Sequence, residues 1–264
     1  MSKERKYKKI FSFKNRKINS GKYNLRYNII IYSWKKNGKE IESKLKDNYL
    51  IVPNYITILN IIDSMRKIIA EYLKYSYKIS QIGGDPDTER TVAIDETLIT
   101  HDDGNQIWLC GAIDTTNKNI RLDVLPQRNS EEINIFIKNH VIPGTNITHD
   151  GWGGYICLDD NDSVWTHETH NHGADDFGSG THSTSHIESY WSFFKSILKK
   201  LYPIFPHKKY IYFIREGEFR TKISGKSKEK IISLLFKMFK MVFEYCEFDF
   251  SSEEDILDFN NYDY

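Results

Sequence analysis

Three acidic residues, each at the edge of an apolar segment, constrain this sequence more than any other feature. Asp95 lies in the apolar segment 92–97, Asp150 directly follows the segment 145–149, and Glu188 lies in the opening turn of an amphipathic segment. The first two segments are typical of short buried strands, and the third is typical of a helix. We therefore expect the three carboxylates to meet at one end of a sheet, where a hard cation such as Mg2+ finds oxygen ligands.

The segments that follow Asp95 predict antiparallel strands. Residues 91–98, 106–114 and 120–126 are apolar and are joined by short connections rich in polar residues and glycine. Such connections are typical of hairpins. We expect three neighbouring strands that run in alternating directions.

The next segments predict a crossover and two more strands. Ser130 is a suitable N-cap for a helix, and residues 145–149 follow as a fourth strand. A strand entered through a helix runs parallel to its neighbour in the sheet. Trp152 begins a further helix, and residues 164–167 predict a fifth, short strand.

Two alternatives for the acidic residues stay open. Glu96 competes with Asp95, but neighbouring residues in a strand point to opposite faces, so only one of them can line the site. Asp175 or Asp176 can replace Glu188 as the third acid.

The same residues resemble a known family. The Gly83-Gly84 turn, the strand around Asp95, the segment 150–155 and the helix 187–191 are similar, in this order, to Merlin-type DDE transposases and their bacterial insertion-sequence relatives. The match covers roughly residues 83–222. The resemblance implies an α/β fold of the ribonuclease-H-like type, a mixed sheet flanked by helices.

The resemblance also implies roles for particular residues. Asp95, Asp150 and Glu188 would be the catalytic residues and would hold two Mg2+ (or Mn2+) ions, and Lys195 would contact the DNA end. Residues 210–221 resemble the Glu-Phe-x-Arg helix of the family. By this resemblance, Arg215 and Arg220 would line a DNA channel. Two positions depart from the family pattern: Ser185 stands where an asparagine is common, and the usual histidine is displaced to His182.

The polar stretch 159–184 suits a loop over an active site. Five histidines in and near it offer an alternative, a zinc site, because imidazoles close in sequence can share a metal ion. The helical spacing of metalloprotease ligands is missing, which favours ordinary loop histidines. The five are His167, His170, His172, His182 and His186.

The N-terminal region predicts helices. Residues 23–37 and 39–46 have helical patterns, and a longer helix starts near Pro53. Two short helices before a third are typical of a helix-turn-helix, although any small helical bundle gives a similar pattern. The third helix would present four residues to a DNA groove: Asn54, Tyr55, Thr57 and Asn60.

Charge and composition complete the domain division. Residues 1–27 hold ten Lys or Arg and one Glu, whereas residues 247–264 hold seven acids and no base. We expect a disordered basic arm at 1–22, a helical DNA-binding region at 23–82, a catalytic domain at 88–222, and a C-terminal helix with an acidic tail at 223–264. The helix 231–243 is strongly apolar and either packs on the core or forms a dimer surface.

Other classes of protein are disfavoured. The sequence has no apolar run of roughly 20 residues and no signal peptide, so we expect no membrane span and no secretion. The nucleus, or the cytoplasm and nucleoid if the source is bacterial, is the expected location. Three dispersed cysteines predict neither disulfides nor a zinc ribbon.

The resemblance implies a metal-dependent enzyme, a transposase that cuts double-stranded DNA at transposon ends and joins the 3′-hydroxyl to target DNA. It would act as a homodimer or a higher oligomer on DNA. One alternative is a nuclease of the same fold that does not join strands. The other is a catalytically inactive DNA-binding protein derived from a transposase.

Overall fold

The computed structural model describes residues 38–48, 55–84, 90–101, 103–160, 162–169, 184–205 and 208–245. The chain forms two compact units, Met1–Met65 and Arg66–Tyr264. Two helices are described in the first unit, α3 (Gly38–Asn48) and the first part of α4 (Tyr55–Ile79). The helix predicted at 23–37 lies outside the described residues, so the helix-turn-helix stays a prediction.

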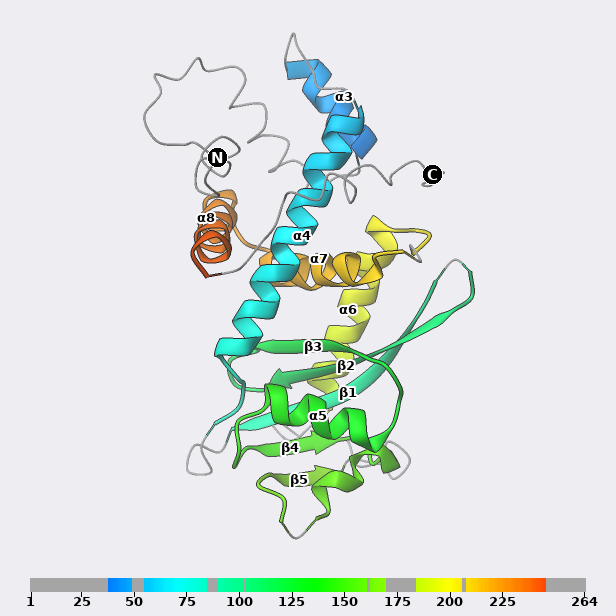
Figure 1. Cartoon of the computed structure of the whole chain (residues 1–264), viewed down its shortest axis with the longest axis vertical. Coiled ribbons are helices and arrows are strands. Elements are labelled where there is room, and N and C mark those ends of the chain that lie inside the picture. Colours follow the sequence, from blue (N-terminus) through cyan, green and yellow to red (C-terminus); the bar gives the residue numbers. More distant parts are fainter. Residues whose placement is uncertain are drawn as a thin grey trace. The chain divides into compact units, whose positions relative to one another are not determined.

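The second unit is built on five strands, which lie side by side in Figure 1: β1 (Thr91–Thr100), β2 (Gln106–Asp114), β3 (Ile120–Leu125), β4 (Asn146–His149) and β5 (Thr166–Thr169). Their order in the sheet is β3-β2-β1-β4-β5. The first three strands pair antiparallel, whereas β4 runs parallel to β1 and β5 runs parallel to β4. This is the ribonuclease-H-like arrangement, and the predicted fold class is confirmed.

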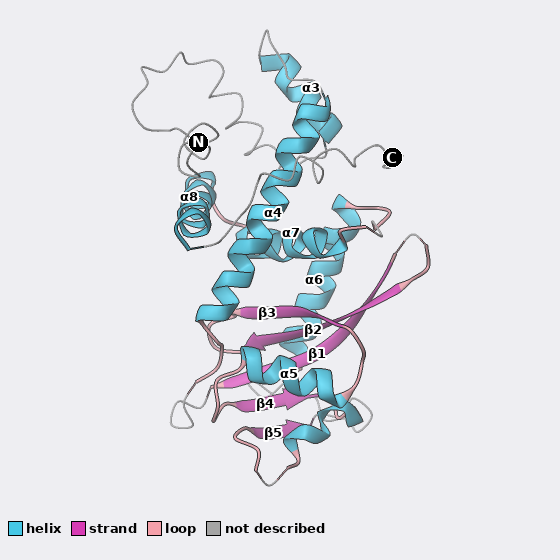
Figure 2. Cartoon of the chain, viewed as in Figure 1, coloured by secondary structure: helices cyan, strands magenta, loops and turns pink. Residues whose placement is uncertain are grey.

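Helices cover both faces of this sheet. The helix α5 (Ser130–His140) crosses in front of the strands in Figure 2, and the 3-10 helix η2 (Gly153–Leu158) packs with it. The other face carries α6 (Ser185–Leu201) and α7 (Tyr210–Ile223). Because successive strand residues point to opposite faces, Val92 and Ile94 pack toward α5 while Ala93 packs toward α6.

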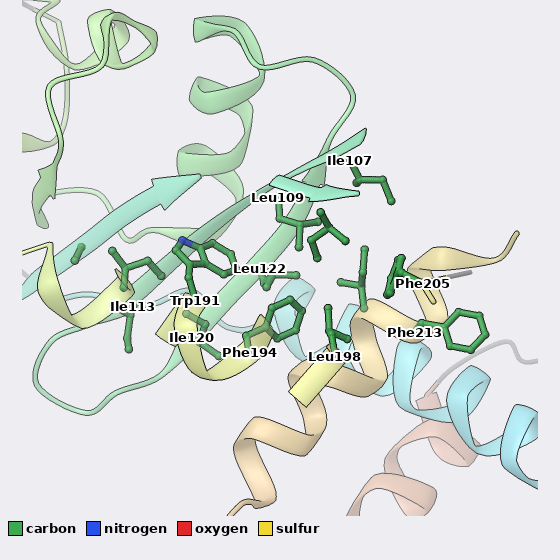
Figure 3. Packing of buried hydrophobic residues seen from close by; sticks show 14 residues of the cluster. Ile107, Leu109, Ile113, Ile120, Leu122, Trp191, Phe194, Leu198, Phe205 and Phe213 are labelled. Atoms are coloured by element: carbon green, nitrogen blue, oxygen red, sulfur yellow. The ribbon is translucent and has the colours of Figure 1, made fainter. Parts of the chain in front are cut away.

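The contact between β2 and α6 depends on a glycine. Trp191, Phe194 and Leu198 of α6 pack against apolar residues of β2 and β3 (Figure 3). A Cβ atom on Gly111 would lie 2.6 Å from Cζ2 of Trp191. The indole therefore occupies the space that any other residue at position 111 would need, and glycine lets α6 lie close to the sheet.

Three local expectations differ from the structure. Asn129, not Ser130, caps α5, because the Asn129 side chain accepts a hydrogen bond from the amide of Glu132. The helix expected from Trp152 is only the six-residue η2, since two glycines open it and glycine disfavours a longer helix. The fifth strand lies at Thr166–Thr169 because its pairing with β4 begins at Asn146 and Thr166.

The second unit includes the last turns of α4, so it begins before the turn at 83–87 that was predicted as the boundary. Arg66 of α4 donates to Glu216 of α7 at 2.7 Å, and the Tyr202 hydroxyl also donates to this carboxylate. Arg220 binds the other oxygen of Glu216. Burial alone raises the pKa of Glu216, but Arg220 and Arg66 bring it down to about 2.

A second buried network joins α4, α7 and β3. Tyr77 of α4 donates a hydrogen bond to Glu218, which also pairs with Arg215 at 3.1 Å. Arg215 in turn binds Asp123 of β3. Burial by itself raises the pKa of Glu218, and Lys222 and Arg215 together lower it below its usual range. These charges hold the two helices to the sheet.

The predicted basic arm (1–22) and the acidic tail from residue 247 onward lie outside the described residues, so these parts of the division stay predictions. The helix α8 (Lys228–Tyr245) buries Ile231, Leu235 and Met238, which favours packing on the core over a free dimer surface. Cys110 is buried and Cys157 is partly buried, and Cys246 lies outside the described residues. No described helix has both the length and the apolar character needed to span a bilayer.

We predict that Gly111→Ala destabilises the fold by about 1–3 kcal/mol, because the added methyl group overlaps the Trp191 indole. Urea unfolding measures the change. Gly153→Ala is the matched control, since a Cβ at Gly153 meets nothing within 4 Å. Equal effects of the two substitutions would contradict this packing argument.

We predict that Glu216→Gln lowers the free energy of unfolding by about 3 kcal/mol at neutral pH, because it leaves two buried arginines without their shared carboxylate. The lowered pKa means that this stabilisation is present above the ordinary value of 4.5 and is lost as the pH falls toward 2. The deficit should therefore shrink at about pH 3. Glu229→Gln, on the exposed surface of α8, is the control; a deficit that does not change with pH would contradict the pairing.

Candidate active site

The parallel pairing of β1 with β4 brings two of the three predicted acids together. Val92 is paired with Ile147 and Ala93 with Thr148. The same register continued by two residues places Asp95 opposite Asp150. Alternation along each strand puts both on the face that α6 covers, because Ala93 packs on that face.

The third acid comes from the first turn of α6. Ile187 and Trp191 of this helix are buried against the sheet, and Glu188 is exposed beside them. The Thr184 hydroxyl, at the start of the helix, donates to Oε1 of Glu188 at 2.7 Å. Trp191, one turn after Glu188 in α6, packs on Gly111, and Gly111 pairs with Asp95 across β1 and β2. This packing therefore sets the position of Glu188 along the sheet relative to Asp95.

The site is crowded with negative charge. Burial, followed by the charges of Glu96, Asp150 and Glu188, raises the pKa of Asp95 to about 7. The charges of both other predicted acids therefore act on Asp95. An arrangement of this kind favours either a proton or a cation among the carboxylates.

The chemistry of the donor set fits a divalent cation, although the carboxylates would have to move closer together to share one. Within the residues that the structure describes, no three His, Cys, Asp or Glu side chains are gathered closely enough to bind a metal ion. Carboxylate oxygens are what Mg2+ prefers, and a cation would relieve the repulsion at Asp95. A ligand from Glu188 would come from a carboxylate whose Oε1 atom already accepts the Thr184 hydroxyl.

Glu96 points away from this site. Its carboxylate is buried on the α5 face, where it accepts hydrogen bonds from the Tyr155 hydroxyl and from Arg128 at 3.1 Å. Burial raises the pKa of Glu96 more than Tyr155 and Arg128 lower it. The expectation that only one of Asp95 and Glu96 can line the site agrees with this geometry.

The backing of the site contains residues that sequence reasoning missed. Tyr155 stacks on His149, with ring centroids 4.3 Å apart, and Arg128 lies over the Trp152 ring at 4.0 Å. Alternation predicts that His149 faces away from Asp150. The ring partners of His149 come from η2 and β5, so no local sequence pattern could predict them.

The predicted DNA contacts in α7 are corrected by the structure. Arg215 and Arg220 are only 7% and 8% exposed, and both are engaged by buried carboxylates, Arg215 with Glu218 and Arg220 with Glu216. Loss of either partner would leave a buried charge unpaired, and guanidinium groups engaged in this way do not line a DNA channel.

The other predicted DNA contacts have varied positions. Lys195 is exposed on α6, two turns after Glu188. Tyr55 and Asn60 are partly buried in α4. Asn54 and the side chain of Thr57 lie outside the described residues, so the groove contacts of this helix stay predictions.

The histidines do not gather in the part of the chain that the structure describes. His167 lies on β5 beside His149, while His186 lies on α6 with its Nε2 atom 3.3 Å from Nζ of Lys118. Burial and then the charge of Lys118 lower the pKa of His186. His170, His172 and His182 lie outside the described residues, as do Asp175 and Asp176.

Comparison with known proteins adds a family. Residues 83–222, more than half of the chain, match the sequence model of the ISXO2-like transposase domain. No curated protein matches the chain. The solved catalytic core domain of HTLV-2 integrase in complex with magnesium is similar in its dimeric form, at 16% identity over 53% of this chain and 94% of that chain, with a TM-score of 0.38. The trimeric form gives the same identity and coverage, with a TM-score of 0.35.

We predict that Asp95→Asn stabilises the metal-free protein, and more so at high pH. The folded state holds the Asp95 proton more tightly than the unfolded state, whose pKa is near 3.8, so wild-type stability falls as the pH rises from about 4 to about 7. Asparagine removes this loss.

Because Asp95 keeps some contact with solvent, the gain should be on the order of 1–2 kcal/mol larger at about pH 8 than at about pH 5. Urea unfolding in EDTA measures it. Asp162→Asn, in an exposed turn, is the control. A gain at Asp95 that is independent of pH would contradict the crowding of carboxylates.

Proposed function

The chain belongs to the ISXO2-like transposase domain family, and we propose that it is a DNA transposase of the DDE class. Asp95, Asp150 and Glu188 would be its catalytic residues. The single observation that carries this proposal is the register of β1 and β4, which sets two of these acids side by side under the helix that bears the third. The closer assignment, to the Merlin type, rests on the order of the motifs.

The substrate would be double-stranded DNA at the ends of a mobile element. In the first reaction water attacks the phosphodiester bordering the element, the bond from phosphorus to the 3′-oxygen breaks, and a 3′-hydroxyl is freed. In the second, that hydroxyl attacks a phosphodiester of target DNA, so a new bond forms and the 3′-oxygen of the target leaves. Neither reaction needs a covalent bond to the protein.

The three carboxylates would hold two Mg2+ (or Mn2+) ions. When bound, such ions activate water or a 3′-hydroxyl and stabilise the leaving oxygen. Asp95 would supply a ligand from within β1 and Asp150 one from the turn directly after β4, whereas Glu188 would supply one from the first turn of α6. Lys195, exposed on the same helix as Glu188, would contact the phosphates of the DNA end.

The regions on either side would add recognition. The basic segment 1–27 suits a contact with the phosphate backbone, and α4 would present Tyr55, Thr57 and Asn60 to a groove. Two ends must be held together for joining, so we propose that the chain acts as a homodimer or a higher oligomer on DNA. In a eukaryotic source this would take place in the nucleus, and in a bacterial source in the nucleoid.

We predict that Asp150→Asn reduces cleavage and joining on the order of 10³-fold or more, while DNA binding changes little, because the substitution removes a metal ligand and keeps the shape of the side chain. Duplex oligonucleotides that carry the inverted repeats flanking the coding sequence serve as substrate, in Mg2+ or Mn2+. Asp95→Asn and Glu188→Gln should behave alike. Glu131→Gln, exposed on α5, is the matched control.

The same assay separates the alternatives. Cleaved ends without joined products would favour a nuclease of the same fold. Salt-sensitive binding by a wild-type protein that never cleaves would favour an inactive DNA-binding descendant. Unchanged activity in Asp150→Asn would remove this residue from the proposed site.

A further inference from the structure

His149 directly precedes Asp150 in the sequence, but it lies on the opposite face of the sheet. The His149 side chain is only 3% exposed. Its ring stacks on Tyr155, and Tyr155 also donates to Glu96, the neighbour of Asp95. His149, Tyr155 and Glu96 thus form a buried polar layer on the face of the sheet opposite the two aspartates. His149 and Glu96 are each next to one of the aspartates in sequence, and Tyr155 contacts both His149 and Glu96.

The hydrogen bonds of His149 determine where its proton lies. The amide of Gly151 can only donate, so the Nδ1 atom of His149, at 3.1 Å, accepts. In a neutral imidazole the proton then lies on Nε2, which donates to Nδ1 of His167 at 3.1 Å. The Nε2 atom of His167 carries its own proton and donates to Asp159 at 3.2 Å. The chain of bonds runs in one direction from His149 to Asp159.

The same turn carries the Asp150 carboxylate. Oδ1 of Asp150 accepts a hydrogen bond from the amide of Trp152 at 2.9 Å. The intervening Gly151 has a φ of 79°, a backbone conformation that favours glycine. Two consecutive amides of one tight turn are therefore held by two consecutive side chains, Gly151 by His149 and Trp152 by Asp150. Loss of the first bond frees the turn on which the second depends.

We propose that His149, held by His167, is a positioning residue that fixes the turn after β4 and thereby aims the Asp150 carboxylate. This inference rests on the proposed function, because it assigns Asp150 as a metal ligand. His149 touches neither the DNA nor an ion in this scheme. It acts from behind, as residues that orient metal ligands commonly do.

Two substitutions at this position separate positioning from packing. His149→Leu fills the space but cannot accept the Gly151 amide. His149→Asn can accept it, because an asparagine side chain commonly binds the amide two residues later. We predict that His149→Leu raises the Mg2+ concentration for half-maximal thermal stabilisation and for half-maximal cleavage by about 10–100-fold. His149→Asn should stay close to wild type in both.

His140→Leu is the matched control. His140 is also buried, at 4% exposed, and bonds a carboxylate, Asp123 at 3.0 Å, but it lies at the end of α5. The His140→Leu substitution should lower the melting temperature without changing the Mg2+ concentration for half-maximal stabilisation or cleavage. If His149→Leu also lowers only the melting temperature, or if His149→Asn shifts the Mg2+ dependence as far as His149→Leu does, the positioning role is overturned.

A measurement without metal distinguishes this inference from the proposed function. Side-chain ¹⁵N NMR of the metal-free protein at neutral pH should show His149 and His167 both protonated at Nε2 and bare at Nδ1. The opposite tautomer at His149 would overturn the bond to Gly151 whatever the enzyme does. If the tautomers are as expected but Mg2+ neither stabilises the wild-type protein nor supports cleavage, the proposed function fails, and the assignment of Asp150 as the residue being aimed fails with it.

Discussion

The parallel pairing of β1 with β4 is the interaction on which the rest of the site depends. The register of this pairing places Asp150 opposite Asp95. A shift of the register by one residue would turn one of these carboxylates to the opposite face. The crossover through α5 makes this pairing parallel, and the apolar contacts of Ile147 and Val92 with α5 hold it. Strand register therefore determines which acidic side chains can meet at the site.

The sheet separates two polar environments, one on each face, where the middle of β1 lies beside the end of β4. One face bears Asp95 and Asp150, close to Glu188, where like charges and burial raise the pKa of Asp95. The opposite face bears Glu96, whose carboxylate is neutralised by Arg128 and bonded by Tyr155. A hard cation would balance the negative charge on the first face, whereas Arg128 balances the charge of Glu96 on the second. This asymmetry explains how adjacent acids in one strand can have different roles.

Much of this arrangement could be predicted because it follows from periodicity. Alternation along a strand separates Asp95 from Glu96, and a helix between two strands makes them parallel. The burial of Arg215 and Arg220 could not be predicted in this way. The partners of α7 include Arg66, 150 positions from Glu216 in the sequence, and only the tertiary fold decides whether such a charge meets solvent or a carboxylate. The pairing of His149 with His167 likewise needs the register of β4 with β5.

The most direct test of the central claim is to locate Mn2+ by anomalous diffraction from crystals of the wild-type protein with the DNA of an element end. The account predicts manganese between the carboxylates of Asp95 and Asp150, with Glu188 as a further ligand. Manganese bound elsewhere in a cleavage-competent complex, with these three carboxylates unligated, would contradict it.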